Sequence, residues 1–466
     1  MSLGKVLSVE GPIVDVVFMN PSDVPDLYEA IETKCYGDKS LILEVVEHHE
    51  NMVVRCVALG STLNLQYNAV ARSLGERICI PIGDELFGRI INVLGEPIDR
   101  KGKINAKEKI PIRKDTSNIR INPDRMMGAD PEILETGIKM IDFLFPLVKG
   151  SKTGILGGAA LGKSILILEM INNIVGQHKG ACVFTGAGER IREGNELYYE
   201  FVKQGIVDKV MMAFGQMDEP PGARFEIAMT GITLAEYLQD QNKDVLFFID
   251  NVYRFVQAGA EISTLLGRVP SETGYQPTLA SEVSDFQERI RSRKGGSITA
   301  IESLYVPSDD LTDPAVVAIF SYLDSILVLS RDKVQLGLYP AIDPLASSSS
   351  NLDPTIIGRE HFNIAQECLK ILTKYEELRR VVMIIGMEEL SKADRTLYAR
   401  ARKLLNFFTQ PFCVSEVYTG RKGEYVPLKE TLEGCNNIVT GRADTIPEEA
   451  LYLIGKFEQA KAREKP

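Results

Sequence analysis

Residues 157–164 contain a complete phosphate-loop motif, G-x-x-x-x-G-K-[ST]. The motif consists of Gly157, Gly158, Ala159, Ala160, Leu161, Gly162, Lys163 and Ser164. The apolar run 153–156 before it predicts a strand, and the run 165–171 after it predicts a buried helix. Glycines let the backbone wrap a phosphate closely, while main-chain N–H groups and the helix N-terminus supply partial positive charge. Lys163 adds a full charge, and the hydroxyl of Ser164 is expected to coordinate Mg²⁺. The motif therefore predicts binding of a nucleoside triphosphate.

The composition is that of a globular chain and disfavours a nucleic-acid partner. The chain has 466 residues, 44% hydrophobic and 25% charged, enough for several domains with cores of their own. Its formal net charge of −11 is unfavourable for binding a phosphate backbone. Residues 1–5 match neither a secretory signal nor a transit sequence, and no apolar run approaches the ~20 residues of a membrane span. Any attachment to a membrane is therefore expected to come through partners.

The cysteines and histidines predict no metal site. Seven cysteines are scattered without a C-x-x-C pair, which predicts reduced, mostly buried thiols. The adjacent His48 and His49 have no companion ligands, so surface strand positions fit them better than a zinc site.

Hydrophobic patterns divide the chain into three predicted domains, at residues 1–76, 77–350 and 351–466. The first has short β-branched runs separated by turns, which predicts a small closed β-barrel. The second alternates helical patterns with near-continuous apolar runs, which predicts a parallel sheet covered on both faces. These runs are residues 181–184, 209–214 and 245–249. The third is helical, so the predicted fold class is a multidomain α/β protein with a barrel before the sheet and helices after it.

Charged residues follow two of the predicted strands. Asp250 directly follows the run 245–249, where a nucleotide-hydrolysing enzyme needs a second carboxylate near its metal. The loop at 186–194 places Glu189 beside Arg190 at the end of another strand. Hydrolysis needs a group that orients water and cations that balance the charge on the γ-phosphate. On spacing alone, a solvated charged loop explains residues 186–194 as well as a catalytic loop does.

Several longer strings resemble the β subunit of F-type ATP synthases. Residues 188–195 are similar to the family's G-E-R-T-R-E-G-N segment. Further strings follow in the family's order, at residues 215–224, 248–255, 274–280, 305–314 and 425–431. The resemblance runs nearly end to end. It implies a β-barrel crown, a RecA-like nucleotide-binding domain and a helical C-terminal domain.

The resemblance also implies a role for each residue that matches a family motif. Glu189 would polarise the attacking water, and the cationic side chains would contact the phosphates. The implied catalytic residues are Lys163, Glu189, Arg190 and Arg254. The implied metal ligands, partly through water, are Ser164, Glu193 and Asp250. The implied base pocket is formed by Tyr339, Phe412 and Tyr418. Without the resemblance, a core position is the alternative interpretation of Phe412 and Tyr418, though not the favoured one.

The implied substrate is ATP or ADP with Mg²⁺, and the implied assembly is a ring of six. In this ring, three such chains alternate with three α-type chains around a central γ-type shaft. An arginine finger would come from the neighbouring α-type chain, so an isolated copy is expected to be nearly inactive. Other subunits would connect the complex to a membrane sector. The expected location is the cytoplasmic face of a membrane, or the matrix side in an organelle.

The chain departs from the family's usual strings at five places. Three changes are small: Ala160-Leu161 and Ser164 in the phosphate loop, Ile191 for Thr, and Tyr418 for Phe. A larger one is the stretch 343–350, which lacks the acid and the arginine of the usual D-P-L-D-S-T-S-R. The last is the lever at 388–394, which has three acids and one lysine where D-E-L-S-E-E-D has five acids.

These features leave three hypotheses for the function. The first is the catalytic β-type subunit of an F-type rotary ATPase. The second, motivated by the altered lever and the missing arginine, is a β-like paralogue that drives motility or secretion. The third is a hexameric nucleic-acid translocase, which the net charge and the family strings disfavour.

Overall fold

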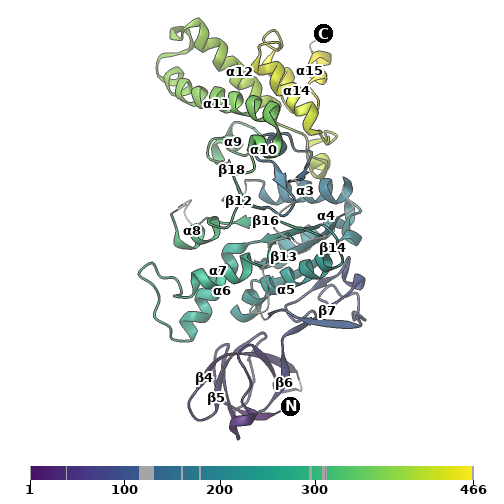
Figure 1. The fold of residues 1–466 in the computed structure, drawn as a ribbon, viewed down its shortest axis with the longest axis vertical. Coiled ribbons are helices and arrows are strands. Elements are labelled where there is room, and N and C mark those ends of the chain that lie inside the picture. The colour runs from purple at the N-terminus through teal and green to yellow at the C-terminus, as the bar shows by residue number, and fades with distance from the viewer. Residues whose placement is uncertain are drawn as a thin grey trace. The chain divides into compact units, whose positions relative to one another are not determined.

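The computed structural model describes residues 2–37, 39–114, 131–158, 161–177, 180–292, 296–306, 310 and 312–463 (Figure 1). The chain forms two compact units. Unit 1 comprises Met1–Gly128 and Ala181–Tyr322, and unit 2 comprises Ala129–Gly180 and Leu323–Pro466.

Unit 1 begins with a closed barrel of antiparallel strands in the order β1-β2-β5-β4-β3-β6. The strands are β1 (Leu3–Glu10), β2 (Ile13–Phe18), β3 (Glu29–Lys34), β4 (Ser40–His49), β5 (Val53–Ala58) and β6 (Val70–Arg77). Gly11, with φ +62°, makes the turn between the paired residues Glu10 and Ile13. Inward valines, isoleucines and leucines fill the barrel, among them Val14, Ile31 and Leu43, each fully buried. The predicted barrel is confirmed.

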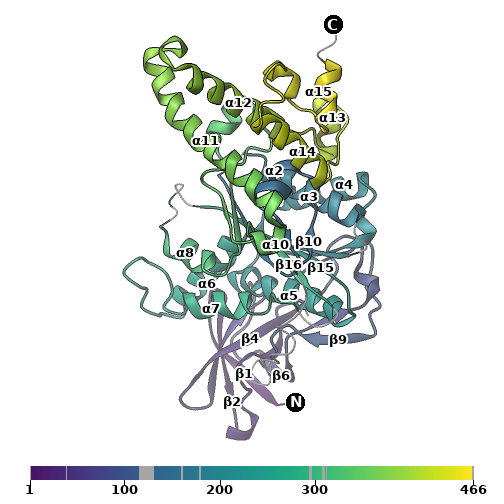
Figure 2. The same ribbon diagram turned by 45° about the horizontal axis from the view of Figure 1, so that its top comes forward.

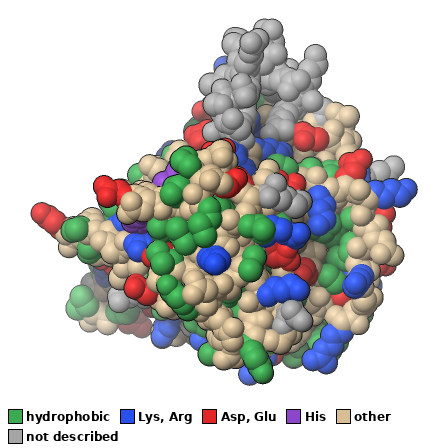
Figure 3. Space-filling view, turned by 90° about the horizontal axis from the view of Figure 1, so that it is seen from below, with side chains coloured by type: hydrophobic (Ala, Val, Ile, Leu, Met, Phe, Trp, Pro, Cys, Tyr) green, Lys and Arg blue, Asp and Glu red, His purple; other side chains and the backbone are tan. Residues whose placement is uncertain are grey.

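Apolar side chains also gather on the outer surface at the barrel end of unit 1 (Figure 3). The exposed large ones in this part of the chain are Leu3, Leu7, Met19, Leu27, Tyr28, Tyr36, Leu63, Tyr67 and Val70. Exposed apolar patches on a soluble domain are typical of protein–protein contacts.

The rest of unit 1 is built on parallel strands in the order β16-β15-β13-β14-β8. The strands are β8 (Ile90–Ile91), β13 (Ala181–Glu189), β14 (Val210–Gln216), β15 (Val245–Asp250) and β16 (Ile298–Leu304). The helices are α4 (Ile191–Lys203), α5 (Pro221–Asp240), α6 (Val252–Leu265), α7 (Leu279–Gln287) and α8 (Pro314–Phe320). A short ribbon joins β7 (Cys79–Ile82) to β9 (Glu108–Pro111). Almost every strand residue is buried, which confirms the predicted parallel sheet and the three apolar runs.

Unit 2 contains strands that precede and follow the phosphate loop. β12 (Lys152–Leu156) pairs in parallel with β17 (Ser325–Val328), and β18 (Ser348–Ser349) pairs antiparallel with β17. A second small ribbon joins β10 (Ile133–Leu134) to β11 (Leu147–Val148). The helices are α2 (Lys139–Leu144), α3 (Lys163–Gln177), α9 (Arg331–Gln335), α10 (Pro354–Ile357), α11 (Arg359–Ile385), α12 (Lys392–Phe408), α13 (Glu416–Thr419), α14 (Leu428–Val439) and α15 (Glu458–Arg463). The C-terminal part is therefore helical, as predicted.

Helices α11 and α12 form a long hairpin whose tip contains the predicted lever (Figure 2). Gly386, with φ +86°, ends α11, and the side chain of Ser391 caps α12 by accepting the Asp394 N–H at 3.1 Å. Tyr375 and Tyr398 hold the two helices together with ring centroids 4.8 Å apart. Apolar side chains at the end of α11 are exposed, among them Val381, Met383, Ile384 and Met387.

Two further predictions from the sequence are confirmed. All seven cysteines are free thiols. Cys35, Cys56, Cys182, Cys368 and Cys435 are buried, whereas Cys79 and Cys413 are half-buried. His48 and His49 lie exposed at the end of β4. Within the described ranges, no helix is both long enough and apolar enough to span a bilayer.

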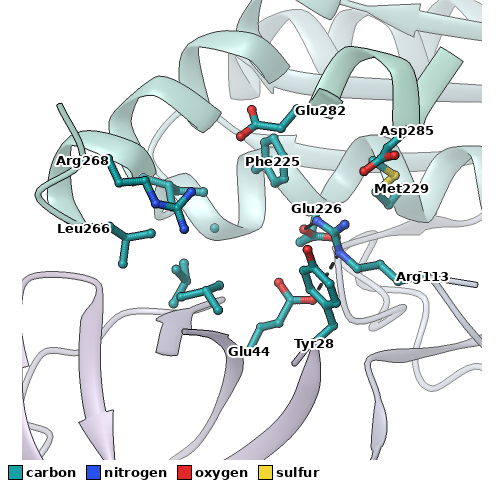
Figure 4. A pocket seen from close by; sticks show the side chains of 14 residues that line it. Tyr28, Glu44, Arg113, Phe225, Glu226, Met229, Leu266, Arg268, Glu282 and Asp285 are labelled. Carbon is teal, nitrogen blue, oxygen red and sulfur yellow. Dashed lines mark hydrogen bonds and ion pairs between the residues drawn. The ribbon is translucent and has the colours of Figure 1, made fainter. Parts of the chain in front are cut away.

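Arg113 contacts two buried carboxyl groups where the barrel joins the parallel-sheet part of unit 1 (Figure 4). Arg113 forms an ion pair with Glu226, and its Nε lies 3.5 Å from Oε1 of Glu44 on β4. The guanidinium also covers the ring of Tyr28 at 4.5 Å. Burial, followed by the charge of Glu226, raises the pKa of Glu44 to about 8. Glu44 is therefore mainly protonated in the folded chain at neutral pH.

This protonation predicts a pH-dependent stability. Between about pH 5 and pH 8 the folded chain keeps a proton on Glu44 that the unfolded chain releases, so the free energy of unfolding falls as pH rises. Glu44→Gln, which stays neutral, should remove this slope. At each pH, the quantity to compare is the melting temperature of Glu44→Gln minus that of the native chain. This difference should be ~2–4 °C larger at about pH 8.5 than at about pH 5. Melting curves at both pH values test this.

The matched control is Glu32→Gln in the same barrel. The pKa of Glu32 is lowered, first by the hydroxyl of Ser40 and then by Arg72, so this group is ionised in both folded and unfolded chains above about pH 5. Glu32→Gln should therefore leave unchanged the fall in the free energy of unfolding between about pH 5 and pH 8. Equal slopes for the native chain and Glu44→Gln would contradict the prediction.

Candidate functional site

The phosphate loop lies between β12 and α3 in unit 2, in the strand–loop–helix context that its motif predicts. An added Cβ at Gly157 would lie 2.9 Å from Cβ of Leu329, so only glycine fits there without a shift. Gly162 has φ +85°, in the left-handed region that favours glycine. Gly158 is half-buried beside Gly157, whereas Ala159 and Ala160 lie outside the described residues.

The first turn of α3 presents the two side chains expected to contact the phosphates and the metal. Lys163 is half-buried and Ser164 is exposed, both at the helix N-terminus. The first N–H groups of a helix have no partner within the helix and carry partial positive charge. This end of α3 is therefore suited to an anionic group.

A cavity of about 270 Å³ lies in unit 2 beside the phosphate loop. On the loop side it is lined by Leu161, Gly162 and Ile165. The opposite walls include all three aromatic residues of the predicted base pocket, Tyr339, Phe412 and Tyr418. Apolar and aromatic walls next to a phosphate site suit a planar base that binds by stacking.

The exposure of each aromatic side chain shows whether it is a core residue. Phe412 is 6% exposed and belongs to the core while also lining the cavity. Tyr418 is 78% and Tyr339 44% exposed, so neither is a core residue.

Gln410 connects the walls of this cavity, although the sequence analysis did not identify it. Its main-chain N–H donates to the carbonyl of Tyr339 at 3.0 Å. Its side-chain Nε2 donates to the carbonyls of Gly137 at 2.7 Å and Glu424 at 2.6 Å. A glutamine directly before the Pro411-Phe412 pair was the only sequence signal for this residue.

Unit 1 brings together the other predicted residues at the carboxyl ends of two neighbouring strands. β13 ends at Glu189 and β15 ends at Asp250, and the register places Gly186 opposite Asp250. Glu189 and Asp250 are both half-buried. Ligands of parallel sheets bind beyond these ends.

The predicted cations and the remaining acid follow in the first turns of α4 and α6. Arg190 is the N-cap residue of α4 and lies 3.6 Å from the carboxylate of Glu193. Arg254 lies in the first turn of α6 and donates to Gln257 at 2.9 Å. Gly188, with φ +64°, lies against Arg254, and a Cβ there would come within 3.0 Å of the arginine Cβ.

Two further residues at this edge were missed in the sequence. Asn251 caps α6 by accepting the Tyr253 N–H at 2.9 Å, and it also accepts the Tyr305 N–H at 3.3 Å. Glu219 follows β14, and burial raises its pKa to about 7. In the sequence, the asparagine after the strand-end aspartate was a signal for a helix cap. The burial of Glu219 could be recognised only from the fold.

The donor set fits a magnesium ion that keeps much of its water. Mg²⁺ prefers oxygen ligands and is usually held by one or two carboxylates, waters and substrate phosphates. Ser164 in unit 2 carries one oxygen of this kind, and Glu193 and Asp250 in unit 1 carry others. In the described part of the chain, no three His, Cys, Asp or Glu side chains cluster as a complete protein cage would require.

Three family models match the chain. The model of the ATP synthase alpha/beta family, nucleotide-binding domain, matches residues 137–349, and that of the family's beta-barrel domain matches residues 6–75. These two models together cover more than half of the chain. The chain belongs to the ATP synthase alpha/beta family.

A third model, the C-terminal domain of V and A type ATP synthase, matches residues 350–447. Membership makes the chain a nucleotide-binding subunit of a rotary ATPase, with ATP and ADP as its substrates. The predicted resemblance is thereby confirmed at the level of the family. The C-terminal match carries the V and A type description, whereas the sequence strings resemble the F type.

Gly188→Ala tests whether the close contact with Arg254 matters for turnover. A side chain in the left-handed region costs ~1–2 kcal/mol, and the added Cβ would also displace Arg254. We expect ATP turnover of the natively purified complex to fall by about tenfold or more. Gly205→Ala is the control, since Gly205 has φ +69° but open space around it. Equal turnover of the two variants would contradict the prediction.

Proposed function

We propose that the chain is the catalytic β-type subunit of an F-type rotary ATPase, which interconverts MgATP with ADP and phosphate as a central shaft rotates. The observation that carries this proposal is the half-buried carboxylate of Glu189 at the end of β13. It lies in the segment that resembles the family's catalytic G-E-R-T-R-E-G-N string. A non-catalytic α-type chain is expected to lack this carboxylate.

In this proposal the two units supply different parts of the reaction. Unit 2 binds the nucleotide: Lys163 holds the β- and γ-phosphates, and Tyr339, Phe412 and Tyr418 hold the base. Unit 1 supplies Glu189, which orients the attacking water. The cations that balance the γ-phosphate are Arg190 and Arg254, and the metal ligands are Ser164, Glu193 and Asp250. Bound Mg²⁺ would neutralise charge on the phosphates.

The same proposal assigns partners to two apolar surfaces. Exposed side chains at the barrel end fit contacts with α-type chains in an alternating hexamer, where the neighbour supplies an arginine finger. The apolar tip of the α11–α12 hairpin fits a central γ-type shaft. The complex would be peripheral, on the cytoplasmic or matrix side of a membrane, and attached through other subunits.

Glu189→Gln tests the catalytic role directly. The amide keeps the shape of the side chain but cannot polarise water as a carboxylate does, so turnover should fall by about 10²–10⁴-fold. Binding of MgATP should survive, because the phosphate loop and base cavity belong to unit 2. The measurements are steady-state turnover of the complex and equilibrium binding of MgATP.

The matched control is Glu196→Gln on α4, which also removes one carboxylate. Glu196 is 62% exposed and pairs with Arg192 at 3.0 Å, away from the strand ends. Its turnover should equal that of the native complex. Retained turnover in Glu189→Gln would refute the role of Glu189.

A second function is favoured by the departures at the partner-facing segments. A β-like paralogue in a rotary ATPase repurposed for motility or secretion would keep the hydrolytic residues and change the surfaces that contact its partners. In the stretch 343–350, Ala346 and Ser350 stand where the family string has its acid and its arginine. The hydroxyl of Ser350 donates to the Asp324 carbonyl at 2.9 Å, so this position holds a local main-chain contact in place of the charge in the family string.

Mass spectrometry of the intact complex, purified natively through a tag on this chain, distinguishes the two functions. We expect α-, γ-, δ- and ε-type partners together with an ion-translocating ring. Recovery of an α-type partner and a shaft with other proteins, and without such a ring, would replace the first function by the second.

A further inference from the structure

A buried glutamate links the phosphate-loop helix to the wall of the base cavity. Glu169 lies on α3, six residues after Lys163, and its side chain is fully buried. Its two carboxylate oxygens accept separate main-chain N–H groups: Cys413 donates to Oε1 at 3.1 Å and Val414 to Oε2 at 3.0 Å. These contacts join segments more than 240 residues apart in the chain.

The two N–H groups belong to the start of a short helical segment. Cys413–Ser415 forms a 3₁₀ helix, and Phe412 is the residue before its first turn. N–H groups at a helix start have no partner within the helix, so a carboxylate placed there completes their hydrogen bonding. Burial raises the pKa of Glu169, while the N–H groups of Val414 and Cys413 act in the opposite direction.

The same two elements line the base cavity. Ile165 and Leu166, one turn before Glu169 on α3, form part of one wall. Phe412, directly before the capped segment, and Tyr418, in the helix α13 that follows it, form part of the other. Asn173 supports the glutamate from the next turn of α3: its Nδ2 lies 3.4 Å from Oε1 and donates to the Thr136 carbonyl at 2.9 Å.

We propose that Glu169 is a positioning residue for the nucleotide base: its bidentate contact with residues 413–414 holds Phe412 and Tyr418 at a fixed distance from the phosphate-loop helix. Glu169 itself does not line the cavity, so it acts through the aromatic wall. This inference rests on the proposed binding of ATP in unit 2 and deepens it. It separates the determinants of base affinity from those of phosphate affinity.

Loss of the Glu169 carboxylate should weaken binding of the base selectively. Without the carboxylate, two buried N–H groups lose their acceptor, and residues 412–418 must shift to find other partners. The side-chain hydrogen bonds of Glu169 go to Cys413, Val414 and Asn173, which all lie outside residues 157–164, so the phosphate loop should keep its own geometry. Ligands with a base should therefore bind more weakly, while a ligand that consists only of phosphates should not.

Isothermal titration calorimetry of the full chain tests this with two probes, MgADP and magnesium tripolyphosphate. Glu169→Ala should weaken MgADP binding by about tenfold and tripolyphosphate binding by less than about twofold. Glu169→Gln should fall between Glu169→Ala and the native chain, because its carbonyl oxygen can still accept one N–H. If Glu169→Ala does not fold, the ratio of the two affinities in Glu169→Gln decides.

Asp343→Asn is the matched control, since Asp343 is also a carboxylate of unit 2 that accepts two main-chain N–H groups, those of Leu345 at 3.0 Å and Ala346 at 3.3 Å. It does not line the cavity, and its ratio of affinities should equal that of the native chain. An unchanged ratio in the Glu169 variants, or the same change in Asp343→Asn, would overturn the inference. Failure of the native chain to bind either probe would instead refute the proposed function.

Discussion

The parallel strands of unit 1 are buried on both faces, and this burial determines where polar chemistry can occur. Their main-chain groups bond within the sheet and their side chains are almost all apolar. In β13 and β15 the only charged side chain is therefore the one at the point where the strand ends. β13 leaves at Glu189 and β15 at Asp250, and parallel register makes these exits neighbours. The positions of Arg190 and Arg254 follow, because Arg190 is the N-cap residue of α4 and Arg254 lies in the first turn of α6.

Unit 2 has the features needed to bind a ligand in which an anionic group is joined to an apolar ring. The start of α3 offers the main-chain N–H groups of a helix N-terminus together with Lys163, and the apolar side chains that follow line a cavity with aromatic walls. Two buried polar side chains, Gln410 and Glu169, fix these walls through main-chain contacts. The aromatic residues can thus stay exposed, as Tyr418 is, because their backbone is anchored.

Much of this could be predicted from the sequence because it depends on local patterns. The strands that end at Glu189 and Asp250 are continuous apolar runs, and the phosphate loop is a fixed motif. Gln410, Glu169 and Glu219 were missed for one shared reason. Their roles depend on burial or on partners distant in the chain, as when Glu169 caps residues 413–414. No local spacing distinguishes such a glutamate from one on a solvated helix face.

The sequence by itself determined the order of barrel, parallel sheet and helices, the phosphate loop, and the acids at the strand ends. The hydrophobic period, the residue types of turns and the spacing of motifs are properties of neighbouring residues, so they can be recognised without knowing the fold. Only the tertiary structure decided that Phe412 is a core residue that also lines the cavity. The same holds for the proton that Glu44 keeps beside Glu226, and for the contact by which Glu169 joins α3 to residues 413–414 at the cavity wall. Each of these depends on which distant groups share a buried volume, because burial changes the energy of a charge and of an unpaired N–H.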